Sequence, residues 1–147
     1  MAPRNQQGTG QKGHWDKTYT DNPTFFGEGP SEFAYTVPSL FKSAGVRSVL
    51  ELGCGQGRDT LLFAGEGFQV TALDYSETGL LKLQGSARET GVSDCIATQS
   101  FDVRKPLPFP NGSYDAGYSH MLLCMELSAT ELRFLLGEIR KDAFFSP

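Results

Sequence analysis

The chain has few cysteines and no excess of positive charge. Its three cysteines, Cys54, Cys95 and Cys124, lie far apart and form no C-x-x-C pair. This argues against a disulfide framework and against a zinc site. Thirteen Lys and Arg residues stand against 17 Asp and Glu residues, for a net charge of −4. Because nucleic-acid binding depends on neutralising phosphates, we expect no nucleic-acid partner.

Long hydrophobic runs are also missing. No stretch reaches the roughly 18–20 apolar residues that a membrane-spanning helix needs. Residues 1–13 are polar and rich in Gly and Gln, which is unlike a secretory signal. We therefore expect a flexible tail over 1–13, one domain over 14–147, no membrane association and a cytoplasmic location. The hydrophobic content of 39% is enough for a packed core.

From residue 47 onward, apolar runs that suit buried strands alternate with helical patterns. The expected strands are 47–53, 69–74, 96–103 and 114–121, and the expected helices are 58–66, 76–90 (with Ser76 as N-cap) and 128–141. A further helix over 31–43 should be weakened or kinked by Pro38. Strands that alternate with helices are typical of a parallel sheet. The expected fold class is α/β, a Rossmann-like doubly wound parallel sheet.

A glycine-rich loop follows the first expected strand. Gly53, Gly55 and Gly57 stand at alternate positions just before a helix. Such glycines allow a tight turn, a close approach of backbone to a ligand, and a helix that starts near the strand. The loop then ends at a helix N-terminus, whose free N–H groups face a crevice. The alternative interpretation is that the loop is only a tight turn and binds no ligand.

Asp74 ends the second expected strand, at the sheet edge that the glycine loop also occupies. A carboxylate in that place can accept hydrogen bonds from two ribose hydroxyls. The alternatives are an exposed strand-end Asp or a substitute N-cap. Together with the loop, Asp74 predicts an adenosine site. Asp74→Ala should then cost about 1.5–3 kcal/mol of cofactor binding with little loss of folding.

Residue spacing distinguishes between cofactors. The dinucleotide pattern G-x-G-x-x-G would need glycine where Arg58 stands, and no P-loop motif is present. Glu51, two residues before Gly53, would repel a pyrophosphate but would suit an ammonium and a sulfonium. The pattern therefore favours a positively charged adenosyl ligand over NAD. An NAD(P)-dependent oxidoreductase is the less favoured alternative.

Four motifs, in this order, resemble those of class I S-adenosylmethionine-dependent methyltransferases. They are VLELGCGQGRD (49–59), ALDYS (72–76), FDV (101–103) and LPFPNGSYD (107–115). The resemblance extends from about residue 14 to residue 141, and it implies S-adenosyl-L-methionine as cofactor and methyl transfer as activity. The aromatic-rich segments 14–19 and 25–27 resemble, more weakly, the N-terminal cover of small-molecule methyltransferases.

The resemblance also implies residue roles. Glu51 and the glycine loop would hold the methionine part of the cofactor. Asp74 would bind the ribose, and Tyr75 would pack on the adenine. Asp102 would accept a hydrogen bond from the adenine amino group, beside the Val103 N–H. The implied cofactor-binding residues are Glu51, Gly53, Cys54, Gly55, Gly57, Asp74, Tyr75, Asp102, Val103 and Ser119.

No catalytic residue can be assigned from the sequence. Residues 119–121 would border the sulfonium and the substrate, and His120 and His14 are candidate general bases for an amine or hydroxyl acceptor. Each histidine could equally be an ordinary packed or surface residue, and Phe25 and Phe26 could wall a pocket or simply pack. The acidic charge balance favours a small-molecule acceptor over a macromolecule.

The family's sheet normally has seven strands, and only about four are found here. The chain reads DAFFSP after residue 141 and stops, where family members continue into a fifth strand. The fourth strand would then be an unpaired edge with exposed apolar surface. We expect either a fragment or variant form of a longer enzyme, or an edge covered by self-association. The alternative function is a truncated, non-catalytic module for cofactor binding or interaction.

Overall fold

The computed structural model describes residues 10–24, 27–120 and 127–142. Within these ranges, four parallel strands form one sheet in the order β3-β2-β1-β4. The strands are β1 (Ser48–Leu52), β2 (Gln69–Asp74), β3 (Ile96–Ser100) and β4 (Ala116–Ser119). The helices are α1 (Gly10–Asp21), α2 (Val37–Ser43), α3 (Arg58–Gly65), α4 (Glu77–Thr90) and α5 (Ala129–Asp142), with short 3₁₀ helices η1 (Phe33–Thr36) and η2 (Ser93–Cys95). The predicted α/β class with an incomplete parallel sheet is confirmed.

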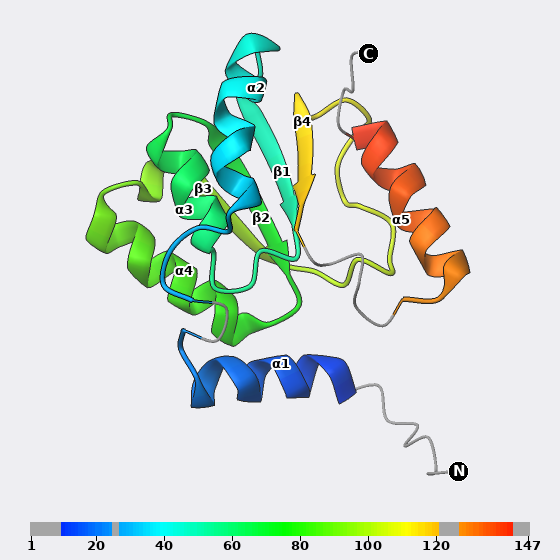
Figure 1. Ribbon diagram of the computed structural model, residues 1–147. Coiled ribbons are helices and arrows are strands. Elements are labelled where there is room, and N and C mark those ends of the chain that lie inside the picture. The colour runs from blue at the N-terminus through cyan, green and yellow to red at the C-terminus, as the bar shows by residue number, and fades with distance from the viewer. Residues whose placement is uncertain (1–9, 25–26, 121–126, 143–147) are drawn as a thin grey trace.

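Helices cover both faces of the sheet (Figure 1). Side chains alternate between the faces of a strand, so Val49 of β1 packs with Phe63 of α3. Its neighbour Leu50 packs with Leu135 of α5 on the opposite face. Each of these fully buried side chains stabilises the fold by roughly 1.5–3 kcal/mol. The double layering therefore follows from the two-sided apolar strands.

The third and fourth strands are shorter than expected. The third ends at Ser100 because its partner β2 ends at Asp74, which pairs with Ser100 in the register. Asp102 and Val103 consequently lie in a turn after the strand. The fourth strand begins at Ala116, since Asp115 before it accepts hydrogen bonds from two backbone N–H groups at the start of β1. Residue 121, the expected end of this strand, lies outside the described residues.

The segment expected to form one helix over 31–43 forms two short pieces. The 3₁₀ helix η1 is followed directly by α2. Pro38 lies in the first turn of α2 rather than in a helix interior. In that position the missing N–H removes no intrahelical bond, so proline begins this helix and does not kink it.

Helix α1 was not expected, and it begins at Gly10, inside the predicted tail. Its sequence has almost no apolar face, and Tyr19 is its one buried residue. Lysine–aspartate pairs one turn apart support it, with Lys12 and Asp16 joined at 2.8 Å. Figure 1 shows α1 lying across the end of the sheet at which β1 and β2 terminate. The helix therefore covers the carboxyl edge of the sheet.

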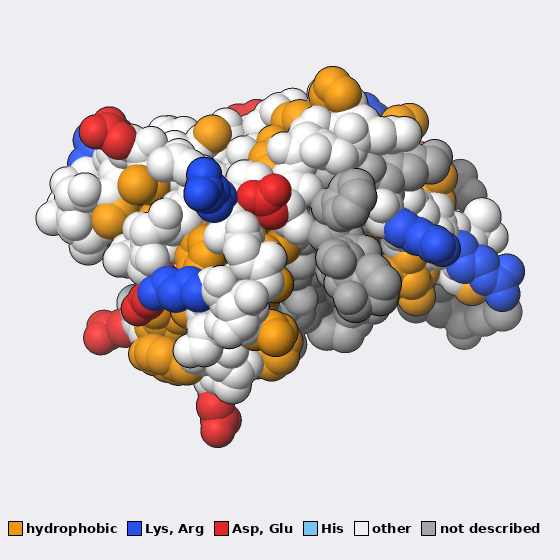
Figure 2. Space-filling view, turned by 90° about the horizontal axis from the view of Figure 1, so that it is seen from above, with side chains coloured by type: hydrophobic (Ala, Val, Ile, Leu, Met, Phe, Trp, Pro, Cys, Tyr) orange, Lys and Arg blue, Asp and Glu red, His pale blue; other side chains and the backbone are white. Residues whose placement is uncertain are grey.

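Strand β4 is an edge among the described residues, because β1 is the strand that pairs with it there. The edge was predicted, although Ala116 and Tyr118 are buried rather than exposed. Large exposed apolar side chains occur instead on helices: Phe33, Tyr35 and Leu40 on η1 and α2, Leu81 on α4, and Phe134 and Leu136 on α5. Figure 2 shows the α2 end of the molecule, where hydrophobic side chains form separate groups with charged side chains between them.

Two further points from the sequence concern Cys124 and membrane-spanning helices. Cys124, the third cysteine of the chain, lies outside the described residues. None of the helices within ranges 10–24, 27–120 and 127–142 has the length and apolarity that a membrane crossing requires.

Candidate functional site

The glycine loop and Asp74 are in direct contact. The Gly55 N–H donates to Asp74 Oδ2 at 2.9 Å, and the Ser76 N–H donates to Asp74 Oδ1 at 2.8 Å. The strand register explains this contact, because Leu52 pairs with Leu73 and both strands end at the same edge. The structure thus places together the two features from which the sequence predicts an adenosine site.

Both Asp74 oxygens keep an acceptor position for a further donor, because a carboxylate offers about four lone-pair sites. Burial raises the pKa of Asp74, while the Ser76 and Gly55 N–H groups oppose this rise. Removing the carboxylate would leave two buried N–H groups without their acceptor. The expectation that Asp74→Ala leaves folding nearly intact is therefore revised: this side chain also holds the loop.

Backbone conformation favours glycine at all three loop positions, and close packing adds a second reason at two of them. All three have positive φ, with Gly57 at 82°, which favours glycine. A Cβ on Gly57 would lie 2.2 Å from Leu83 Cδ1 of α4, so packing also requires glycine there. A Cβ on Gly55 would lie 2.7 Å from the Tyr19 hydroxyl oxygen of α1. The loop is therefore enclosed by helices on two sides.

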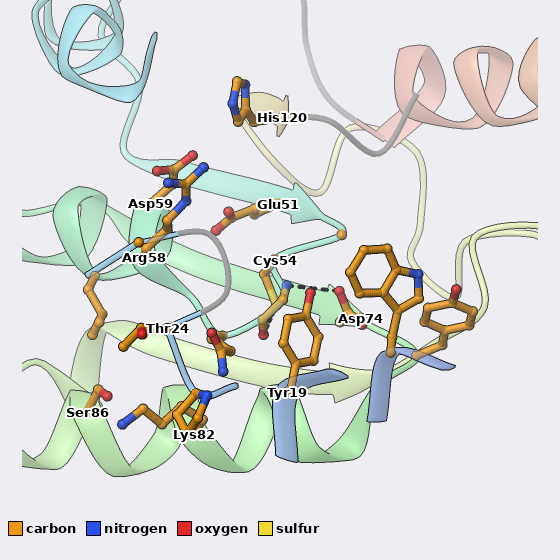
Figure 3. A pocket seen from close by; sticks show the side chains of 18 of the residues that line it. Tyr19, Thr24, Glu51, Cys54, Arg58, Asp59, Asp74, Lys82, Ser86 and His120 are labelled. Carbon is orange, nitrogen blue, oxygen red and sulfur yellow. Dashed lines mark hydrogen bonds between the residues drawn. The ribbon is translucent and has the colours of Figure 1, made fainter. Parts of the chain in front are cut away.

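A cavity of about 350 Å³ adjoins this loop (Figure 3). Among the residues predicted for cofactor binding, seven line it: Glu51, Gly53, Cys54, Gly55, Asp74, Tyr75 and Asp102. Gly57, Val103 and Ser119 do not; Ser119 donates its hydroxyl to the Leu52 carbonyl at 3.2 Å. Of the two candidate bases, His120 lines the cavity and His14 does not. Phe25 and Phe26 lie outside the described residues.

Glu51 is a buried acid in the cavity wall, only 3% exposed. The Thr60 hydroxyl donates to its carboxylate. Burial raises the pKa of Glu51 to about 8, and the nearby charges of Asp59 and Asp74 reinforce the rise. A cation placed beside Glu51 would favour its ionised form. The site is thus suited to a positively charged group at this wall.

Helix α1 closes the cavity from the other side. Gln11, Trp15 and Tyr19 line it, and Figure 3 shows the Tyr19 hydroxyl beside the bond between the loop and Asp74. The helix is docked by polar contacts: Asp16 Oδ1 accepts from the Ser76 hydroxyl at 2.7 Å. The Tyr75 hydroxyl donates to Gln11 Oε1 at 3.2 Å. Sequence reasoning missed this helix, although the i, i+4 lysine–aspartate spacing was a usable signal.

Asp102 lies at the cavity but is already paired. The Arg104 guanidinium donates to it, with Nη2 at 2.6 Å from Oδ2 and Nε at 2.9 Å from Oδ1. This pairing lowers the pKa of Asp102, so the side chain is ionised at neutral pH. An adenine amino group would have to use an acceptor position that Arg104 leaves open.

Asp59, which the sequence did not single out, is the centre of a buried hydrogen-bond network. It is 5% exposed and accepts from the Ser31 N–H at 2.7 Å, the Ser31 hydroxyl at 2.8 Å and the Tyr118 hydroxyl at 2.7 Å. Burial and the adjacent Asp59 raise the pKa of Tyr118. The network ties the segment before η1 to strand β4.

Comparison with known proteins identifies the family. Residues 49–141 match the family described as "Methyltransferase domain". The CcbJ methyltransferase from Streptomyces caelestis has a TM-score of 0.70 and 24% identity, covering 88% of this chain and 51% of that one. A putative S-adenosyl-L-methionine-dependent methyltransferase from Methanococcus maripaludis has a TM-score of 0.64 and 15% identity, with coverages of 96% and 63%. The [4+2]-cyclase SpnF has a TM-score of 0.69 and 22% identity, with coverages of 97% and 57%.

These structural likenesses establish the fold alone and not the activity. The proteins that share this fold include a cyclase as well as methyltransferases. The chain spans between about half and two thirds of the length of these structures. No curated protein sequence matches it. The family match, in contrast, covers more than half of the chain. The chain therefore belongs to the methyltransferase-domain family and has the class I S-adenosylmethionine-dependent methyltransferase fold.

Proposed function

We propose that this chain binds S-adenosyl-L-methionine in the cavity under α1 and directs its methyl group to a small-molecule acceptor. One observation carries the proposal. Glu51 and Asp74 are buried carboxylates at the ends of neighbouring strands, and both line the same cavity. In the sequence, the glycine loop lies between them. A cationic nucleoside offers partners for both, an ammonium for Glu51 and ribose hydroxyls for Asp74.

The residues present fit this cofactor. Besides the two carboxylates, Gln56 lines the cavity with a buried side-chain N–H₂ group that has no hydrogen-bond partner. Such an orphaned donor is expected to meet an acceptor on a ligand, and the cofactor's carboxylate would supply one. A dinucleotide fits less well, because Glu51 would repel its pyrophosphate and Arg58 replaces the third glycine of that fingerprint.

The chemistry asks the protein mainly for positioning. The cofactor supplies a methyl group already activated by its sulfonium, so alignment of the acceptor and exclusion of water can provide most of the rate. Trp15 and Tyr19 of α1 exclude water on one side, and Glu51 and Asp74 fix the orientation of the cofactor. His120 at the cavity wall is the candidate to take a proton from an amine or hydroxyl acceptor.

Three other sequence-based expectations stay proposals. The net charge of −4 favours a small acceptor rather than nucleic acid. A cytoplasmic location and self-association through the β4 edge rest on the sequence and on the edge position of β4 among the described strands.

Calorimetric titration with S-adenosylhomocysteine tests the proposed function. We expect micromolar binding, because both carboxylates and the loop are in place. NADH is the matched control, and its fluorescence should not be enhanced by the protein. No detectable heat with S-adenosylhomocysteine would leave the chain as a non-binding interaction module, and NADH enhancement would favour the oxidoreductase alternative.

A further inference from the structure

A second hollow adjoins the cofactor cavity. It has a volume of about 580 Å³ and is lined by residues of the η1 region together with Arg58 and His120. Arg58 and His120 also line the cavity beside Glu51. The two spaces therefore meet at these two side chains, both of which are labelled in Figure 3.

One of the residues that line the hollow is the aromatic Phe33. Phe33 is 52% exposed, although a phenylalanine is usually buried. Its ring stacks on two rings of the β4 region, with centroids 6.0 Å from Tyr118 at 12° and 6.0 Å from His120 at 20°. Phe33 thus lines the hollow and remains partly exposed although it stacks on these two rings. An exposed, flat, immobilised ring is a surface on which another planar ring can stack.

Buried hydrogen bonds hold this ring in place. Asp59 accepts two bonds from Ser31, two residues before Phe33, and one from the Tyr118 hydroxyl beneath it. Since one carboxylate anchors both the ring and its support, little conformational freedom is left to lose when a ligand binds. Asp59 therefore acts as a positioning residue for the hollow.

We propose that this hollow seats the methyl acceptor and that the acceptor is a planar aromatic compound with a hydroxyl or amine. This inference rests on the proposed function. In this arrangement, the aromatic ring of the acceptor stacks on Phe33. The hydroxyl or amine of the acceptor reaches the cofactor cavity between Arg58 and His120. For a hydroxyl, the new O–C bond forms as the S–C bond breaks. Sulfur keeps the electron pair of the broken bond, and the hydroxyl proton passes to the His120 imidazole.

The two histidines allow a direct test by proton NMR. The chain has only His14 and His120, so it gives two imidazole Cε1–H signals, which His14→Gln assigns. The probe is 2-naphthol, and its saturated counterpart decahydro-2-naphthol is the matched non-planar control. Each is titrated with and without excess S-adenosylhomocysteine. We expect 2-naphthol to shift the His120 signal but not the His14 signal, and decahydro-2-naphthol to shift neither.

Phe33→Leu tests the role of the ring. We expect 2-naphthol to bind roughly 3- to 10-fold more weakly, the size of one aromatic stacking contact. Tyr35→Leu is the matched control, because Tyr35 lies on the same 3₁₀ helix, is 62% exposed and does not line the hollow. It should leave naphthol binding unchanged. Urea unfolding checks that both variants are folded.

The outcomes separate the two proposals. Equal shifts from 2-naphthol and its saturated counterpart, a shift of His14 alone, no shift at all, or unchanged binding in Phe33→Leu would each overturn the aromatic seat. If any of these occurs while S-adenosylhomocysteine binds, the proposed function stands and only the acceptor class fails. Absence of S-adenosylhomocysteine binding contradicts the proposed function itself.

Discussion

The two buried carboxylates of the cavity differ in what surrounds them. Asp74 and Glu51 are 7% and 3% exposed, so burial is nearly equal. Asp74 accepts hydrogen bonds from two backbone N–H groups, whereas Glu51 accepts one from the Thr60 side-chain hydroxyl. The backbone hydrogen bonds therefore offset part of the rise that burial causes in the pKa of Asp74, whereas the pKa of Glu51 is raised to about 8. Asp74 therefore has a structural role besides its proposed ligand contact, whereas the proposed ligand would supply the charged partner that Glu51 lacks among the residues described.

Asp74→Ala should have the largest effect, because it removes a structural anchor and a binding group at once. Two buried N–H groups lose their acceptor, which should lower the free energy of unfolding by on the order of 2–4 kcal/mol. S-adenosylhomocysteine should bind at least roughly tenfold more weakly, since hydrogen bonds to a charged acceptor are worth about 1.5–3 kcal/mol. Urea unfolding and calorimetry measure the two effects.

Asp115→Ala is the control for this variant. Asp115 also accepts two backbone N–H groups, from Arg47 and Ser48, but it is exposed and lies at the opposite end of β1. It should lower stability less and leave ligand affinity unchanged. Equal ligand affinity in Asp74→Ala and the wild type would remove Asp74 from the site.

Glu51→Gln should have opposite effects on stability and binding. The amide has no charge to bury, so the variant should be more stable than the wild type above about pH 8, by on the order of 2 kcal/mol. It should bind S-adenosylhomocysteine roughly tenfold more weakly, because the ligand's ammonium loses a charged partner. Glu66→Gln is the control, since Glu66 forms an exposed pair with Lys42 and should change neither property. A variant that loses stability would show that Glu51 is structural.

The pH dependence of the wild type sharpens the same contrast. The folded chain keeps the Glu51 proton up to about pH 8, whereas the unfolded chain loses it near 4.5. Stability from this group is therefore greatest at low pH, falls as pH rises from 4.5 to 8, and stays low above that. Ligand affinity should rise over the upper part of this range, because binding an ammonium releases the proton. Both slopes should become much smaller in Glu51→Gln, with the raised pKa of Asp74 leaving a residual stability slope. Unchanged slopes would assign them to another group.

Asp16→Ala should have the smallest effect and concerns the cover over both carboxylates. It removes the acceptor for the Ser76 hydroxyl, which should lower the free energy of unfolding by about 1 kcal/mol. We expect faster amide exchange in α1 and a few-fold loss of ligand affinity, with the sheet unchanged. Asp21→Ala is the control, because Asp21 is exposed and pairs with Lys17 on the same helix. Equal exchange rates in the two variants would mean that Asp16 does not dock α1.

Local sequence patterns predicted the elements that have apolar periodicity and are bounded by capping residues or glycines. The Ser76 cap of α4 was predicted, and its hydroxyl accepts from the Gly79 N–H. Helix α1 was not predicted, because it is a polar helix whose position depends on contacts with α4. The bounds of β2 were predicted correctly, but the third and fourth strands were predicted too long, since strand length depends on where the partner strand stops.

The sequence by itself determined the α/β alternation, the glycine turn and the acid at the end of the second strand. These depend on φ preferences and on apolar spacing, which are properties of neighbouring residues. Only the tertiary structure decided the environment of each acid. Asp59 meets Ser31 from 28 residues away and Tyr118 from 59, and Glu51 owes its raised pKa to burial by the whole fold. Hydrogen-bond partners and desolvation depend on packing between distant segments, and no local pattern specifies that packing.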